Sequence, residues 1–339
     1  MTAYRLNRRS ALGLAAGPLL VSLARRARAQ TLHKLVFQTD WRAQAEHGGY
    51  YQALAAGLYR EAGIDCEIRQ GGPSLNVGQL LLTGRVDMTM SNSFEAFTYV
   101  REKAPFFTIA SIFQKDPQVL IGHPDTGFDS FEDLKGRTLL IGSGGRVTYW
   151  PYLRKKYGLK DDQLRPYTFN MAPYLADRNV VQQGFLSSEP YSISQVLGRM
   201  PPVLLIADAG FSAYQSTIAI SRKLATDKRD LVQRFVDATL RGWAQYLEGG
   251  PAIEAANALI KKANPEQTDD RIRYAIAVMN ERGIVMSGDA LQGGIGAMSD
   301  ARWQAFHQSM VDVGVLPGGL DVARAYTLDF VNKGIGKPT

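Results

Sequence analysis

Residues 32–69 read LHKLVFQTDWRAQAEHGGYYQALAAGLYREAGIDCEIR, and this stretch decides the fold class. The apolar run 32–38 predicts a strand, and residues 47–62 have the spacing of a helix. Gly63 is a typical helix end, and residues 64–69 predict a second strand. A strand, a helix and a second strand in this order are typical of an α/β protein with parallel strands.

The same alternation continues along the chain. Further expected elements are a helix at 76–83, a strand at 86–90, a helix at 93–103, strands at 107–112, 119–122 and 137–141, a helix ending at 157, and strands at 203–207 and 217–220. From residue 227 to 330 the pattern is mostly helical. The sequence therefore predicts an α/β fold with a largely helical C-terminal part.

Two α/β cycles without a flexible linker predict two lobes. We expect the first lobe to comprise residues 30–118 and 218–339, and the second to comprise 119–217. Each lobe would hold a mostly parallel sheet flanked by helices, with two strands crossing between them. A ligand would bind in the cleft, at the carboxyl ends of the strands. Periodicity alone also allows one large doubly wound domain.

Composition and charge exclude several function classes. The chain has 339 residues, 45% hydrophobic and 21% charged, which is ordinary for a globular protein. Its net charge is +7, but residues 1–29 carry six arginines and no acid, so about +1 remains on the other 310 residues. A nearly neutral chain lacks the basic surface that nucleic-acid binding requires. We therefore expect no nucleic-acid partner.

The N-terminus has the plan of an export signal. Arg8-Arg9 precede the 13-residue apolar run 11–23, which is too short to span a bilayer, and Ala27-Arg28-Ala29 is a small-x-small cleavage site. The paired arginines resemble a twin-arginine signal. We expect residues 1–29 to be a signal peptide cleaved after Ala29, and the product to be periplasmic.

Metal, cofactor and catalytic motifs are missing from the sequence. The four histidines have no partner at a ligand spacing: His33, His47, His123 and His307. Cys66 is the single cysteine, which excludes cysteine-built metal sites. No nucleophile elbow, Walker loop or dinucleotide fingerprint occurs. We expect no metal, no cofactor and no catalytic residue.

Polar and aromatic residues at strand ends are the candidates for binding. Asp40 and Trp41 follow the first strand, where an indole can stack on a ring and a carboxylate can accept from an amine. Ser91 and Asn92 follow the third strand, where they either cap the next helix or contact a ligand. The loop 142–146 could bind an anion through its backbone amides and one guanidinium, by the residues Ser143, Gly144, Gly145 and Arg146.

A fourth group of candidates lies further along the chain. Glu189 precedes Pro190, which favours extended backbone and would hold the carboxylate away from the chain. Tyr174, Tyr191 and Asp208 are weaker candidates of the same kind. A solvated loop carboxylate and ordinary core aromatics are the alternatives.

These residues together resemble a known family. Asp40-Trp41, then His47-x-Gly49-x-Tyr51-x-Ala53, is similar to the opening motif of periplasmic solute-binding proteins of ABC importers. The branch groups thiamine-pyrimidine-precursor binders with nitrate, sulfonate and taurine binders. Further matches are Gly84-Arg85-Val86-Asp87-Met88 and Ser130-Phe131-Glu132-Asp133-Leu134.

The resemblance implies a type II binding fold that closes on its ligand. It adds His47 and Tyr51 to the expected site, and it implies that Trp41 stacks on an aminopyrimidine-like ring while Asp40 or Glu189 binds exocyclic amines. The partners would be a small molecule and a membrane ABC permease, with the protein a monomer. This sequence departs from that branch at residues 42–44, where a Pro-Asn pair is usual, so the exact ligand stays open. The alternative ligand is an oxyanion held by the amides of residues 142–145 and by Arg146. An exported enzyme with His47 as base is a second alternative, although one cysteine cannot supply the cysteine-rich motif of the related fungal synthases.

Overall fold

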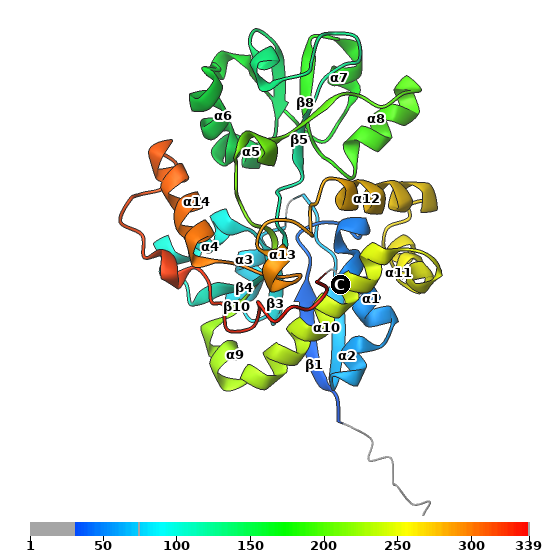
Figure 1. The fold of residues 1–339 in the computed structure, drawn as a ribbon, viewed down its shortest axis with the longest axis vertical. Helices are drawn as coiled ribbons and strands as arrows, with labels where there is room; N and C mark the ends of the chain where they lie inside the picture. The colour runs from blue at the N-terminus through cyan, green and yellow to red at the C-terminus, as the bar shows by residue number, and fades with distance from the viewer. Residues whose placement is uncertain (1–30, 74, 338–339) are drawn as a thin grey trace, which may run out of the picture.

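Two lobes, each built on a five-stranded sheet, make up the computed structural model, which describes residues 31–73 and 75–337 (Figure 1). The predicted signal peptide lies outside these residues. In the first lobe the strand order is β2-β1-β3-β10-β4, with bounds β1 His33–Gln38, β2 Ile64–Arg69, β3 Met88–Ser91, β4 Phe106–Phe113 and β10 Gln215–Ser221. In the second lobe the order is β7-β6-β8-β5-β9, with bounds β5 Gln118–Ile121, β6 Thr138–Ile141, β7 Leu164–Pro166, β8 Val180–Phe185 and β9 Val203–Leu205.

Helices flank both sheets (Figure 1). Those of the first lobe are α1 Gly48–Ala55, α2 Leu58–Glu61, α3 Val77–Leu82, α4 Ser93–Arg101, α9 Arg222–Asp227, α10 Arg229–Glu248, α11 Glu254–Ala263, α12 Asp269–Glu281, α13 Ala290–Gly293 and α14 Asp300–Asp312. Those of the second lobe are α5 Ser143–Val147, α6 Tyr149–Tyr157, α7 Ala172–Ala176 and α8 Glu189–Leu197. Short 3-10 turns are η1 Ala45–His47, η2 Phe131–Leu134, η3 Asp161–Gln163, η4 Ile206–Ala209, η5 Pro251–Ile253 and η6 Val322–Arg324. Within the described residues, every helix is too short or too polar to cross a bilayer.

Both sheets are mixed, with one reversed strand each. β10 runs antiparallel to β3 and β4, and β5 runs antiparallel to β8 and β9. The remaining neighbours pair in parallel, as β1 does with β2 and β3. The predicted α/β fold with two mostly parallel sheets is confirmed, and each sheet admits one strand of opposite direction.

Glycines allow α1 to lie directly against α10, and this packing fixes the start of α1. A Cβ on Gly49 would lie 2.1 Å from the Trp243 ring, and one on Gly242 would lie 2.4 Å from the Gly49 carbonyl oxygen. Both distances are far below van der Waals contact, so neither position has room for a larger side chain. The close crossing holds η1, which carries Glu46 and His47, at the edge of the first lobe that faces the second.

A partly buried arginine holds the two chain segments that connect the lobes. These segments are residues 114–117 and 206–214, and Arg302 on α14 contacts both. Its guanidinium donates to Gln114 Oε1 at 3.1 Å and to the Ser212 carbonyl at 3.0 Å, and it lies 4.1 Å from the Tyr214 ring centroid. Burial lowers the pKa of Arg302. The two crossings are therefore tied to one first-lobe helix.

Candidate functional site

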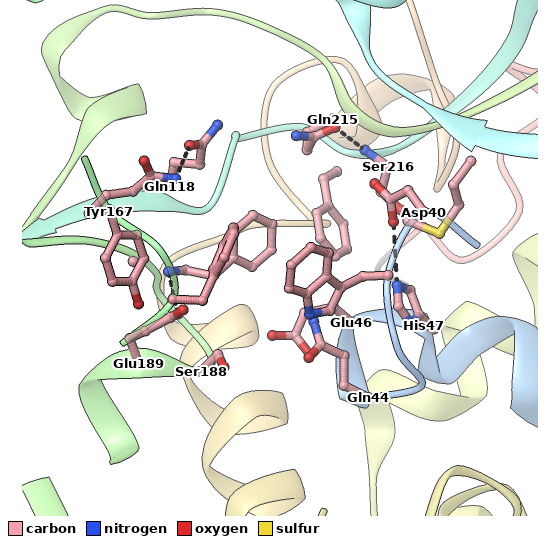
Figure 2. Close-up of a pocket in the computed structure, with 17 residues that line it drawn as sticks. Asp40, Gln44, Glu46, His47, Gln118, Tyr167, Ser188, Glu189, Gln215 and Ser216 are labelled. Atoms are coloured by element: carbon pink, nitrogen blue, oxygen red, sulfur yellow. Dashed lines mark hydrogen bonds and ion pairs between the residues drawn. The ribbon is translucent and has the colours of Figure 1, made fainter. Parts of the chain in front are cut away.

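A cavity of about 200 Å³ lies between the lobes, at the carboxyl ends of β1 and β3 and next to β8 (Figure 2). First-lobe residues form one wall and second-lobe residues the other. The lining consists of Asp40, Trp41, Gln44, Glu46, His47, Met90, Phe113, Gln118, Tyr167, Phe169, Gln183, Gly184, Phe185, Ser188, Glu189, Gln215 and Ser216.

A tight bend after β1 presents Asp40 and Trp41 to this cavity. Thr39 Oγ1 donates to the Trp41 carbonyl at 2.8 Å, and the Gly71 N–H donates to the same oxygen at 2.9 Å. A Cβ on Gly71 would lie 2.5 Å from the Asp40 carbonyl carbon, so the backbones approach closely only because residue 71 is glycine. These two hydrogen bonds and the close approach of Gly71 hold the bend in place. The backbone from which the Asp40 and Trp41 side chains project is therefore fixed.

His47 and Asp40 face each other across the first-lobe wall. Asp40 Oδ1 lies 3.7 Å from His47 Nε2, as Figure 2 shows, and the carboxylate is 41% exposed whereas the imidazole is buried. This separation is an ion-pair distance and exceeds that of a hydrogen bond. His47 Nδ1 is buried with no hydrogen-bond partner among the described residues. Because His47 is too far away to donate a hydrogen bond to it, the Asp40 carboxylate can accept one from a ligand in the cavity.

Glu189 supplies the carboxylate of the opposite wall, in a conformation that differs from the prediction. It is the first residue of α8 and not an extended loop residue, because Pro190 stands in the first turn of that helix, where proline lacks only an N–H that needs no partner. Its Oε2 accepts from the Phe185 N–H at 2.7 Å. Gly184 makes this possible, since a Cβ there would lie 2.9 Å from Glu189 Cβ.

Burial raises the pKa of Glu189, and the nearby Glu46 charge raises it further. The Phe185 amide and Arg271 act in the opposite direction and lower it. Two carboxylates from opposite lobes thus approach one another at the cavity. A group that donates hydrogen bonds between them relieves this repulsion.

Direct contacts across the cleft join the two lobes. Ser187 Oγ donates to Glu46 Oε1, Arg271 Nη2 donates to Ser188 Oγ at 2.9 Å, and Tyr274 OH donates to the Leu186 carbonyl at 3.1 Å. Arg271 and Tyr274 lie on α12, which Figure 1 shows next to α8. The two lobes therefore touch beside the cavity, which remains partly open to solvent where Asp40 and Phe169 are exposed.

The Glu46–Ser187 contact gives a first prediction. In Ser187→Ala, the Glu46 carboxylate stays buried in the closed form without its partner, at a cost of about 1.5–3 kcal/mol. We expect the closed form to lose roughly tenfold in population, which small-angle X-ray scattering will register as a larger radius of gyration. Ser194→Ala is the matched control, because Ser194 Oγ donates within its own helix to the Tyr191 carbonyl. An unchanged scattering curve for Ser187→Ala contradicts the role of this contact in closure.

Aromatic side chains from both lobes meet at the cavity. The Trp41 and Phe169 ring centroids are 5.1 Å apart at 48°, and Phe169 lies 5.2 Å from Tyr167. Phe169 is half exposed and has φ of 61°, which is rare for a bulky residue. Such strain persists where surrounding structure enforces it, often at ligand sites. The rings provide flat surfaces on both sides of the cleft.

Of the predicted site residues, Asp40, Trp41, His47 and Glu189 line the cavity. Three other predicted residues of the first lobe lie outside the cavity lining. Tyr51 is buried in α1, and Ser91 Oγ donates to Glu95 Oε2 at 3.3 Å. Asn92 caps α4, its Oδ1 accepting from the Glu95 N–H at 3.1 Å.

The remaining predicted residues lie outside the cavity lining. Ser143, Gly144, Gly145 and Arg146 form most of α5, a helix where a loop was expected. The Arg146 Nε donates to the Ile141 carbonyl at 3.0 Å.

Tyr174 is buried with its hydroxyl donating to the Gly122 carbonyl at 2.8 Å, and Tyr191 packs 5.4 Å from Tyr274. Asp208 is paired with Lys115 at 3.2 Å and Arg282 at 2.8 Å, next to the crossing segments.

Most residues of the second-lobe wall were not predicted from the sequence. No sequence pattern marked Phe169 or Gln183 as a site residue. One sequence feature could have indicated Glu46: it is an acid directly before His47, where the expected helix begins. None of the residues that line the cavity is Lys or Arg, whereas three are acids.

Comparison with known proteins gives relatives for most of the chain. A family model described as NMT1/THI5 like matches residues 44–250. The riboflavin-binding protein RibY of Chloroflexus aurantiacus is 23% identical over 311 residues, which cover 90% of this chain and 88% of RibY. The 4-amino-5-hydroxymethyl-2-methylpyrimidine phosphate synthase of Schizosaccharomyces pombe is 26% identical over 128 residues, 38% of this chain and 37% of that protein. The periplasmic aliphatic sulphonate binding protein SsuA from Escherichia coli has the same fold, with a TM-score of 0.64 and 14% identity over 86% of this chain and 91% of SsuA.

Proposed function

Because the chain belongs to the NMT1/THI5-like family and has the two-lobe fold of periplasmic substrate-binding proteins, we propose that it is the binding component of an ABC importer. Its ligand is a small nitrogen heteroaromatic, of the aminopyrimidine class. The protein binds this molecule in the periplasm as a monomer and delivers it to a membrane permease.

The observation that carries the proposal is the composition of the cavity wall. Asp40, Glu46 and Glu189 are acids, the aromatic rings come from both lobes, and no lysine or arginine belongs to the lining. Carboxylates accept hydrogen bonds, so they select a ligand that bears N–H donors or a positive charge. Aromatic faces select a flat ring. A ring with exocyclic amino groups meets both requirements.

The cavity volume limits the ligand to about one ring system. An apolar cavity of about 150 Å³ is known to hold benzene, and drug-sized ligands need about 300–1,000 Å³. A cleft of about 200 Å³ therefore fits a substituted single ring. The three fused rings and sugar-alcohol chain of riboflavin, the ligand in RibY's name, require a wider cleft than this one.

An oxyanion is disfavoured by the same wall. The Gly142 N–H, which the sequence offered as an anion donor, donates to Gln183 Oε1 at 2.8 Å. Arg146 lies outside the lining. Three carboxylates would repel a nitrate or sulfonate, and no guanidinium or ammonium group of the wall offsets them.

A titration panel tests the proposal. We expect isothermal calorimetry to show micromolar or tighter binding of 4-amino-5-hydroxymethyl-2-methylpyrimidine, and at least 100-fold weaker binding of riboflavin, ethanesulfonate and nitrate. Binding of the oxyanions alone would reject the proposed ligand class. Mass spectrometry of the recovered pyrimidine addresses the enzyme alternative, since a changed mass would show turnover.

Glu189 gives the second prediction. In Glu189→Gln the side chain keeps its shape but can no longer offer a charged acceptor on both oxygens, so we expect Kd for the pyrimidine to rise about thirtyfold, or about 2 kcal/mol. Calorimetry measures the change. Glu132→Gln, on the outer surface of the same lobe, is the control and should leave Kd unaltered. Equal Kd values for Glu189→Gln and the unmodified protein would remove Glu189 from the site.

A further inference from the structure

Two glutamines in the cavity wall belong to one directed chain of hydrogen bonds. The Gln118 Nε2 donates to Asp116 Oδ2 at 3.2 Å, and Gln118 Oε1 accepts from Gln183 Nε2 at 3.3 Å. Gln183 Oε1 in turn accepts from the Gly142 N–H at 2.8 Å. Figure 2 shows Gln118 on the second-lobe side of the cavity.

The two ends of this chain fix its direction. An ionised carboxylate only accepts and a backbone N–H only donates, so neither amide can turn over without losing a bond at each end. The Gly142 N–H is held in place as the residue before α5. Asp116 is held by a second bond, since its Oδ1 accepts from the Gln118 backbone N–H at 3.1 Å.

Asp116 lies in the first crossing segment, outside the cavity lining, and is 4% exposed. Its two recorded hydrogen bonds both come from Gln118. The titratable group that faces it from a neighbouring element is the Tyr149 hydroxyl of α6. Of the charged residues next to the crossing, Lys115 pairs with Asp208, and Arg302 contacts Gln114.

We propose that Asp116 is a positioning residue of the binding site: it sets which way the Gln118 and Gln183 amides face the ligand, without touching the ligand itself. This inference rests on the proposed function for the identity of the site, and on the hydrogen bonds alone for the mechanism. With Asp116 ionised, each amide meets a ligand in one orientation. The second lobe then presents a fixed pattern of donors and acceptors opposite the first-lobe acids.

Protonation of Asp116 removes the acceptor end of this chain and leaves the Gly142 N–H to hold its direction alone. Burial raises the pKa of Asp116 to about 6, against the smaller lowering by its bonds from Gln118. The protonated acid can donate, so Gln118 can turn its oxygen toward it and then no longer accepts from Gln183 Nε2, while Gln183 keeps its bond from the Gly142 N–H. The side-chain signals of both amides should therefore respond to pH together, although only Gln118 touches Asp116.

The decisive experiment needs no ligand. In ¹⁵N-labelled protein, the side-chain NH₂ signals of Gln118 and Gln183 are assigned by their loss in Gln118→Met and Gln183→Met and followed from pH 5 to 7.5. We expect both pairs of signals to shift with one midpoint near pH 6, and Asp116→Asn to abolish the transition. Constant Gln183 signals in the unmodified protein overturn the proposal, as does a midpoint that persists in Asp116→Asn. If Asp116→Asn does not fold, the pH titration of the Gln118 and Gln183 signals in the unmodified protein still tests the proposal.

Asp125→Asn is the matched control. Asp125 is an exposed acid of the same lobe, and the bonds from Arg199 hold its pKa below the usual range, so it does not titrate in this window. Calorimetry with 4-amino-5-hydroxymethyl-2-methylpyrimidine then links the amides to binding: we expect about tenfold weaker binding in Asp116→Asn at pH 7.5. A coupled titration with no pyrimidine binding would reject the proposed ligand class and leave the positioning mechanism standing.

Discussion

Replacing Trp41 by alanine is expected to weaken binding of an aminopyrimidine roughly 100-fold. The indole covers one face of the proposed ligand ring, and its removal forfeits about 1.5–3 kcal/mol of buried apolar contact together with about 0.5–1.5 kcal/mol of ring–ring interaction. The sum of about 3 kcal/mol corresponds to two orders of magnitude in Kd. Calorimetry at pH 7.5 measures the effect.

Two variants separate stacking from general damage. Trp41→Phe keeps an aromatic face and should lose tenfold or less. Phe131→Ala removes one ring of another second-lobe aromatic pair, whose centroids are also 5.1 Å apart, and should leave Kd unchanged because Phe131 and Tyr157 lie outside the cavity lining. If Trp41→Ala binds the pyrimidine as tightly as Phe131→Ala does, the indole is not a ligand platform.

Asp116→Asn is expected to change how the free energy of unfolding depends on pH. The pKa of Asp116 is raised from 3.8 to about 6 in the folded protein, so the folded state binds a proton more tightly than the unfolded state. The resulting stabilisation is complete below pH 4 and is lost as the pH rises through 6. Between pH 4.5 and 7.5 the loss amounts to about 2 kcal/mol. The asparagine variant lacks this contribution.

Urea unfolding at a series of pH values tests the sign as well as the size. Relative to Asp116→Asn, the unmodified protein should become less stable by about 2 kcal/mol as the pH rises from 4.5 to 7.5. Other acids with raised pKa values, such as Glu95 and Glu189, cancel in this difference because both proteins contain them. A difference that is constant over this range would mean that Asp116 titrates normally.

The elements of the first lobe followed from periodicity because their patterns are local. β2 has the expected bounds, Ile64–Arg69, and α3 begins at Val77, one residue after the start of the expected helix 76–83, because Asn76 is its N-cap. The expected helix 47–62 is divided at Gly57, whose φ of 76° interrupts the helical backbone. These are adjustments at the ends of correctly predicted elements.

The central strand of the second sheet was missed, for a physical reason. β8 lies between β6 and β5, but its sequence VVQQGF has two glutamines and a glycine where a buried strand usually has apolar residues. Gln183 takes part in the directed amide chain, and Gly184 makes room for Glu189. The strand departs from the apolar pattern because its residues serve the cavity.

Residues of the first-lobe wall were predictable, whereas those of the second were not. Asp40, Trp41 and His47 follow one strand and belong to a motif that can be recognised from nearby positions. Phe169 reaches the cavity only because the lobes close, bringing it to Trp41 from 128 positions away in the chain. No local sequence pattern indicates that Trp41 and Phe169 lie next to each other.

The position of β10 between β3 and β4 sets an order of events on the ribosome. Strand β4 ends at Phe113 and β10 begins at Gln215, so all five strands of the second sheet are translated in between. The second sheet can assemble while the first still has a gap one strand wide, with the edges of β3 and β4 unpaired. The nascent chain must keep those edges from pairing with other polypeptides until Ser221 has emerged. The sheet whose first strands are synthesised first is thus the last to receive all of its strands.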